Sequence, residues 1–176
     1  EFLCAVAPNG VLELWRRDED RRVWARALED VRQVHAIPSG CAVIVPGKAQ
    51  LYTRNKRVVD LCFKARALDW DRQRGELLVV AGQNVEIFDS DGKQRALVQG
   101  RKGATAVTRV RDPRDLQRTW LVLGTQAGNI ESVAASAGEA DPLLPLRDVP
   151  RSPVVRLVEG PPGSVALGYA DGTVGL

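Results

Sequence analysis

The feature that most constrains the fold is a short pattern that the chain repeats five times. Each copy is an apolar segment, a tight turn and a second strand-like segment. The copies read CAVAPNGVLELW (4–15), CAVIVPGKAQLY (41–52), LLVVAGQNVEIF (77–88), LVLGTQAGNIES (121–132) and VALGYADGTVGL (165–176). The first two are offset by 37 residues and the last two by 44 residues. Offsets of this size are typical of repeat architectures, in which each unit packs on its neighbours.

Each unit reads as four short strands with tight connections. Residues 23–28 alternate apolar and polar side chains, as a half-buried strand does. The Asn9-Gly10 pair favours a hairpin turn, because both residue types tolerate positive φ. No long segment carries an apolar stripe at helical spacing between helix caps. Four-stranded units at this period predict an all-β fold, a β-propeller built from antiparallel blades.

We expect a single domain, residues 1–176, that holds about four and a half blades, with blade boundaries near 17, 54, 90 and 135. Residues 2–16 are half a blade in this division, three whole blades follow, and the fifth ends at its last strand. The segment from Leu143 to Leu146 is expected to be an edge strand, because prolines flank it. We expect the missing blades to come from a longer chain, as the absence of Met also indicates, or from a partner chain.

Several segments resemble WD-repeat propellers. GYADGTVGL (168–176), VLELWRRD (11–18) and VEIFDSDGK (85–93) are similar to the third strand, turn and fourth strand of such a repeat, and ALDWDRQRGELLVVAG (67–82) to the second and third strands. The Gly-His pair that usually opens a WD repeat is absent, and the only histidine, His35, lies in a different strand. The usual Asp–His–Ser/Thr–Trp network is therefore not expected. Other propellers, including the quinoprotein type, share the strand pattern, but the WD-like type is favoured.

Three cysteines, Cys4, Cys41 and Cys62, lie in strand-like segments at a spacing that matches no zinc motif. Cys4 and Cys41 occupy the same position in successive repeats, so we expect each to face the same side of its own blade. All three are predicted to be buried free thiols that act as small apolar residues. With no Asn-x-Ser/Thr sequon, this predicts a reducing, cytoplasmic location. No apolar run reaches the ~18–20 residues of a membrane span, and no signal peptide is recognisable.

The sequence carries no motif of an active site. Metalloprotease, phosphate-loop, nucleophile-elbow and dinucleotide signatures are all absent. His35 lies in a strand and is predicted to be a structural or surface residue rather than a catalytic one. The pairs Asp69/Asp71 and Asp89/Asp91 lie in or beside turns, where aspartates bond their own backbone. We therefore predict no catalytic residue, no cofactor and no metal, and we expect that the protein is not an enzyme.

The resemblance implies that the blade-to-blade loops and the loops between second and third strands share one face of the disc. Nine arginines in these loops are predicted to contact a protein partner: Arg16, Arg17, Arg54, Arg57, Arg72, Arg74, Arg111, Arg114 and Arg118. The loops hold 14 basic and 11 acidic residues, so the face is mixed in sign rather than strongly basic. They contain no aromatic residue on which a nucleic-acid base could stack.

The resemblance implies a non-catalytic role, since WD-repeat propellers are mostly interaction platforms. We expect a scaffold or sensor that binds a protein partner, or another domain of its own chain, within a larger complex. Two alternatives stay open. One is a propeller that associates with nucleic acid, which is disfavoured by the mixed charge. The other is a propeller enzyme whose site lies in a missing part of the protein. No membrane partner is expected.

Overall fold

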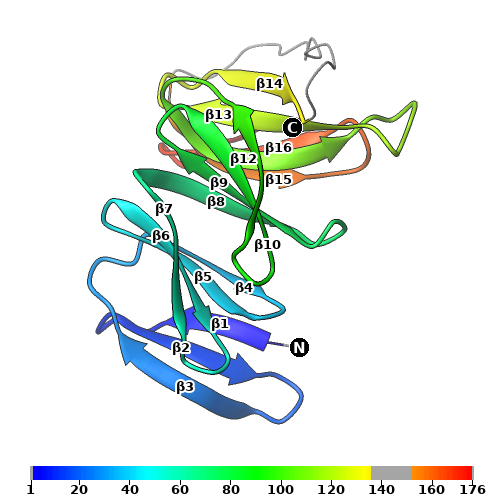
Figure 1. Cartoon of the computed structure of the whole chain (residues 1–176). Coiled ribbons are helices and arrows are strands. Elements are labelled where there is room, and N and C mark those ends of the chain that lie inside the picture. The colour runs from blue at the N-terminus through cyan, green and yellow to red at the C-terminus, as the bar shows by residue number, and fades with distance from the viewer. Residues whose placement is uncertain (1, 136–151, 176) are drawn as a thin grey trace.

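The computed structural model describes residues 2–135 and 152–175, and every regular element in those ranges is a β-strand. Since no helix occurs there, none of these residues forms a membrane-spanning helix. The strands form five antiparallel sheets, each built from consecutive strands in chain order (Figure 1). The predicted edge strand at 143–146 lies outside the described residues. The prediction of an all-β fold with antiparallel sheets is confirmed.

The first two sheets come from the N-terminal third of the chain. Sheet 1 contains β1 (Phe2–Val6), β2 (Val11–Arg16) and β3 (Arg21–Ala27). Sheet 2 contains β4 (Gln33–Ile37), β5 (Gly40–Val45), β6 (Lys48–Thr53) and β7 (Val58–Phe63).

The remaining three sheets follow in the same way. Sheet 3 contains β8 (Ala65–Asp71), β9 (Glu76–Ala81), β10 (Asn84–Asp89) and β11 (Gln94–Gln99). Sheet 4 contains β12 (Ala104–Arg111), β13 (Thr119–Thr125) and β14 (Ile130–Ala134). Sheet 5 contains β15 (Val154–Glu159), β16 (Val165–Tyr169) and β17 (Val174–Gly175).

The hairpin turns form where Gly and Asn predicted them. At the first turn Gly10 has φ of +78°, a conformation that costs glycine little, and its N–H donates to the Ala7 carbonyl at 2.9 Å. This turn places Val6 opposite Leu12 and Cys4 opposite Leu14, and so sets the register of β1 and β2. Local sequence therefore determines this hairpin.

The apolar core lies between successive sheets, which pack face to face. The second strand of sheet 3, β9, divides its side chains by alternation. Leu77 and Val79 pack against sheet 2, whereas Leu78 and Val80 pack against sheet 4. All four are buried. A strand that is buried on both faces reads as a continuous apolar run, which explains LLVVA in β9 and the similar run in β5.

The first strands of sheets 2 to 5 lie next to one another. β8 contacts both β4 and β12, and β12 also contacts β15. Strand β1 contacts β4 and β5. The sheets therefore meet along these first strands, and side chains from distant parts of the sequence come together there.

Three of the predicted boundaries fall inside sheets. The turns near 17, 54 and 90 join β2 to β3, β6 to β7 and β10 to β11, and each of these pairs is hydrogen-bonded. The described sheets change instead between residues 27 and 33, at Lys64, and between 99 and 104. The difference arises because the strand after each polar turn pairs antiparallel with the strand before it, so that both belong to one sheet. Residues 136–151, after the fourth predicted boundary, lie outside the described residues.

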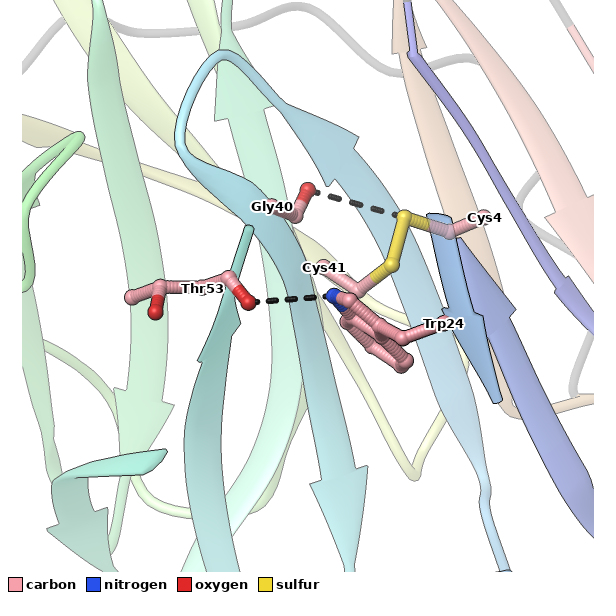
Figure 2. Close-up of a disulfide and its surroundings, with 5 residues drawn as sticks. All are labelled: Cys4, Trp24, Gly40, Cys41 and Thr53. Atoms are coloured by element: carbon pink, nitrogen blue, oxygen red, sulfur yellow. Dashed lines mark hydrogen bonds between the residues drawn. A yellow bond between two sulfur atoms is a disulfide. The ribbon is translucent and has the colours of Figure 1, made fainter. Parts of the chain in front are cut away.

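The prediction of three free thiols is wrong for two of them. Cys4 of β1 and Cys41 of β5 form a disulfide, with their Cα atoms 5.9 Å apart (Figure 2). The repeat pattern placed them at equivalent positions of separate sheets. Because β1 packs against β4 and β5, however, these positions face each other. Cys62 is a buried free cysteine, as predicted, and burial raises the pKa of its thiol to about 12.

Candidate functional site

Three hollows share lining residues near the ends of the first strands; two are lined by sheets 1 to 3 and the third by sheets 3 to 5. The Phe2 hollow has a volume of about 490 Å³, and Phe2, Pro38, Arg54, Trp70 and Arg72 are among its lining residues. It shares Pro38 and Arg54 with a second hollow of about 510 Å³, the Arg57 hollow. It shares Trp70 and Arg72 with a third of about 300 Å³, the Arg109 hollow. The Phe2 hollow therefore adjoins both of the others, and the three together are called the depression below.

Phe2 is the aromatic side chain around which two predicted arginines gather. The guanidinium carbon of Arg54 lies 4.4 Å from the centre of the Phe2 ring, and that of Arg16 lies 5.9 Å from it. Both distances suit attraction between a cation and the face of an aromatic ring. Arg54 also donates from Nη2 to the Pro38 carbonyl, which holds its guanidinium over the hollow. An apolar floor with a fixed cation above it results.

The Arg57 hollow is formed by the turn between β6 and β7 and by the neighbouring turn of sheet 3. The Thr53 hydroxyl accepts the Arg57 N–H at 3.2 Å, which fixes the turn. Across the hollow, the Ser39 hydroxyl donates to the Ser90 carbonyl and joins sheets 2 and 3. The hollow is lined by Arg54 and Arg57 but by one carboxylate only, that of Asp91. Its charge is therefore net positive.

The nine predicted arginines do not form one site. Arg54, Arg57 and Arg72 line the hollows, are exposed, and have no carboxylate within ion-pair distance among the described residues. The other six lie elsewhere on the turns or are paired. Arg16 pairs with Glu19, and Arg111 pairs with Glu159 at 2.8 Å. Arg74 donates to the Gln117 carbonyl at 3.3 Å. The other three are exposed on turns and do not line the hollows: Arg17, Arg114 and Arg118.

Buried charges stabilise the Arg109 hollow. Arg109 of β12 is only 6% exposed, and its Nε lies 3.2 Å from Asp71 Oδ2. Its Nη2 lies 2.7 Å from Glu76 Oε2. Both contacts are ion pairs without good hydrogen-bond geometry, since Arg109 Nε and Glu76 Oε2 are buried and have no hydrogen-bond partner among the described residues. Burial lowers the pKa of Arg109, while the two carboxylates raise it. The group ties β12 to the β8–β9 hairpin.

A second polar cluster joins four first strands beside this hollow. The Thr108 hydroxyl donates to Asp69 Oδ2 at 2.8 Å, and His35 Nδ1 lies 4.0 Å from Asp69 Oδ1. Arg156 Nη1 lies 3.3 Å from His35 Nε2, which acts as the acceptor when the imidazole is neutral. Burial, with the charges of Arg156 and Arg72, lowers the pKa of His35 to about 4.

The chemistry of this cluster is that of a structural network. The Thr108 hydroxyl donates to Asp69, and His35 accepts from Arg156, so these four side chains link the first strands of sheets 2 to 5. Burial is the main reason why the pKa of Asp69 is raised. The prediction that Asp69 forms a turn is wrong, because its side chain contacts another sheet. Asp71 does form a turn, accepting the Gln73 and Arg74 N–H groups at 3.0 and 3.1 Å.

Sequence reasoning missed the residues that give the hollows their shape. Phe2, Pro38 and Trp70 were not recognised as site residues, because they come from three separate strands or strand ends. The sequence signal that could have indicated contacts between sheets is a polar residue within an otherwise apolar strand, such as Thr108 or Arg109 in β12. In the described ranges there is no group of three or more His, Cys, Asp or Glu side chains arranged to hold a metal ion.

Comparisons with known proteins concern the fold. No protein-family model and no curated protein matches the sequence. Among solved structures, a computationally designed protein, Ika4, is similar with a TM-score of 0.60 and 17% identity, over 85% of this chain and 91% of that one. Hsv2 of Kluyveromyces lactis is similar with a TM-score of 0.53 and 14% identity, over 98% of this chain and 55% of Hsv2. At these identities the likeness concerns the arrangement of the strands alone.

Proposed function

We propose that this chain is part of a WD-like β-propeller that acts as a non-catalytic interaction scaffold. Four-stranded and three-stranded meanders that stack face to face in chain order support this arrangement, and so do solved structures with propeller-like folds. The five sheets would then be five blades, of which some are incomplete. The partner is another protein, or another domain of the same chain, within a larger complex.

The depression formed by the three hollows is the docking face in this proposal. The observation that carries it is the grouping of Arg54, Arg57 and Arg72, which pair with no carboxylate in residues 2–135 and 152–175, around the apolar surfaces of Phe2 and Pro38. Arginine and aromatic side chains are the residue types that most often anchor protein interfaces. A guanidinium binds a carboxylate through two parallel hydrogen bonds. We therefore expect the partner to present an acidic segment with one apolar side chain.

Binding of an acidic peptide tests this function. The probe is a fluorescent peptide set rich in Asp and Glu, each with a single Leu or Phe, and anisotropy measures its dissociation constant. The variant R54A/R57A/R72A removes the three hollow arginines and should weaken binding at least about tenfold, since anchor residues each contribute about 1 kcal/mol or more. The matched control R74A/R114A/R118A changes the charge equally on turns outside the hollows and should bind as the wild type does.

Two outcomes would refute the docking face. Equal losses in the two triple variants would show that net charge alone attracts the peptide. No loss in the hollow variant would show that the depression is not the binding surface. The same variants, used to capture cross-linked partners from the cells of origin, should give the same ranking.

Single-stranded nucleic acid is a second candidate because of one structural observation. Phe2 and Trp70, which are in strands rather than loops, line the same hollow as Arg54 and Arg72. Aromatic rings beside cations can stack bases. An oligonucleotide titration at several salt concentrations separates the two candidates, since binding to phosphates weakens steeply with salt. A propeller enzyme has no comparable support in the described residues.

A cytoplasmic location was expected from three reduced cysteines. The Cys4–Cys41 disulfide removes this basis, because disulfides persist mainly in oxidising compartments.

A further inference from the structure

The Cys4–Cys41 disulfide joins two sheets beside the proposed docking face. Cys41 of β5 is fully buried, whereas Cys4 of β1 is only half-buried. Figure 2 shows the bond between the two strands, with Trp24 of sheet 1 packed beside Cys41. The indole N–H of Trp24 donates to the Thr53 carbonyl at 3.1 Å, so a second link between sheets 1 and 2 lies next to the disulfide.

Strand β1 has few other attachments. It is the edge strand of sheet 1 and pairs only with β2 in that sheet. Leu3 and Val6 of this strand are exposed, at 55% and 37%. The disulfide and the packing of β1 on β4 and β5 therefore determine where β1 lies relative to sheet 2.

The position of β1 sets the Phe2 hollow. Phe2 is two residues from Cys4 on the same strand, so both side chains lie on the same face of β1. The ring of Phe2 meets Arg54, which belongs to the turn after β6 in sheet 2. The disulfide thus holds together the two sheets whose residues form this hollow.

We propose that the Cys4–Cys41 disulfide is a reducible clamp that holds the Phe2 hollow in its docking shape. This inference rests on the proposed docking function and concerns the regulation of the same site. Opening the clamp frees β1 to move relative to sheet 2, which separates Phe2 from Arg54. The reduced protein then loses the apolar floor of its docking face.

The reaction is a thiol–disulfide exchange with a dithiol reductant. A thiolate of the reductant attacks Sγ of Cys4, the less buried of the two residues, and forms a mixed disulfide, while Cys41 leaves as a thiolate and takes a proton. The second thiol of the reductant then releases Cys4 as a thiol. In total two electrons and two protons pass to the cysteines, and the reductant becomes a disulfide.

The reduced state can form a hydrogen bond that the oxidised state lacks. Cys4 Sγ lies 3.5 Å from the Gly40 carbonyl oxygen (Figure 2). A sulfur in a disulfide carries no proton, so this is only a contact in the oxidised protein. After reduction the Cys4 thiol can donate to that carbonyl, because a thiol is a weak donor.

Cys62 makes the thiol chemistry easy to follow. It is buried in the core between sheets 2 and 3, and its pKa of about 12 keeps it protonated and unreactive. The oxidised native protein should therefore contain no thiol that iodoacetamide modifies. Reduction of the clamp should add two.

The test uses the full native protein with dithiothreitol as the dithiol. Mass spectrometry after iodoacetamide should show modification of Cys4 and Cys41, and not of Cys62, only after the reductant is added. Hydrogen exchange of the amides in residues 2–6 should then accelerate at least about tenfold, while exchange in β9 stays unchanged, because loss of the clamp opens β1 locally. A C4A/C41A variant should exchange as the reduced wild type does, with or without dithiothreitol.

Three results would overturn the clamp. Modification of Cys4 and Cys41 without reductant would show that the native protein has no disulfide. Modification that requires denaturant would show a permanent structural bond. Reduction with unchanged exchange in β1 would show that packing alone holds the strand. The R54A/R57A/R72A variant should keep the redox response, so a failed docking face and a failed clamp give different results.

Discussion

Replacing Arg109 with methionine should destabilise the protein strongly, because Arg109 is the only described cation that contacts two carboxylates at the β8–β9 hairpin. Asp71 and Glu76 are direct cross-strand partners, and Arg109 contacts both. Their side chains are 11% and 26% exposed, and that of Arg109 is 7% exposed, so water screens the group weakly. Removing one partner of a buried ion pair typically costs about 3–5 kcal/mol, and like charges opposite each other on two strands are also unfavourable. We expect R109M to lose about 3 kcal/mol of unfolding free energy at pH 7.

The two carboxylates that remain should cause the loss. Without Arg109, the folded state holds two neighbouring negative charges, those of Asp71 and Glu76, with no cation between them. The double variant R109M/E76Q, which removes one of the charges, should recover part of the stability at pH 7.

The assay is urea unfolding followed by tryptophan fluorescence, with R111M as the matched control. Arg111 lies two residues further along β12 and pairs with Glu159, but both side chains are about a quarter exposed. A partly exposed ion pair contributes about 1 kcal/mol or less, so R111M should be the milder variant. Equal losses in R109M and R111M, or no recovery of stability in R109M/E76Q, would refute this account of the cluster.

Three further predictions concern other described contacts. Gly40→Ala should cost several kcal/mol or prevent folding, because a Cβ there would lie 2.0 Å from a backbone oxygen of β6. The control Gly47→Ala would place its Cβ at a point with no atom within 4 Å and should cost only about 1 kcal/mol. Thermal unfolding compares the two variants. The folded-state pKa of His35 is lowered to about 4, so the wild type should lose about 2–3 kcal/mol of unfolding free energy as the pH falls from 6.5 to about 4. His35→Gln should remove most of this loss. Urea unfolding at a series of pH values measures it, and the same pH dependence in both proteins would contradict the prediction. Trp24→Phe should cost at least about 1 kcal/mol through the lost hydrogen bond to the Thr53 carbonyl, and a value near zero by urea unfolding would contradict it.

Much of the strand pattern could be predicted because it depends on neighbouring residues. The segment from Leu77 to Ala81 is apolar throughout, which indicates a strand buried on both faces, and its side chains do pack alternately against two sheets. The turn at Asn9-Gly10 formed where its residues favour positive φ. The sheet boundaries were harder, because a polar turn looks the same whether its two strands pair or separate. Hydrogen bonding between β6 and β7 decides this for the turn near 54.

The candidate site could be predicted only in part. Its arginines were selected by loop position, and Arg54, Arg57 and Arg72 do line the hollows, but Arg114 and Arg118 do not. Phe2, which forms the apolar surface beside Arg54, comes from the first strand of the chain. Nothing in the local sequence around Phe2 indicates that it meets a turn some fifty residues later.

The sequence by itself determined the strands, their turns and the apolar faces that must be buried, since these depend on residues a few positions apart. Only the tertiary structure decided which sheets face each other and therefore which distant side chains meet. Cys4 bonds to Cys41 because β1 packs against β5. His35 and Arg156 lie 3.3 Å apart although 121 residues separate them. Such contacts follow from the stacking of whole sheets. Burial of apolar surface drives this stacking, and because the hydrophobic effect is not directional, the local sequence does not specify which sheets meet.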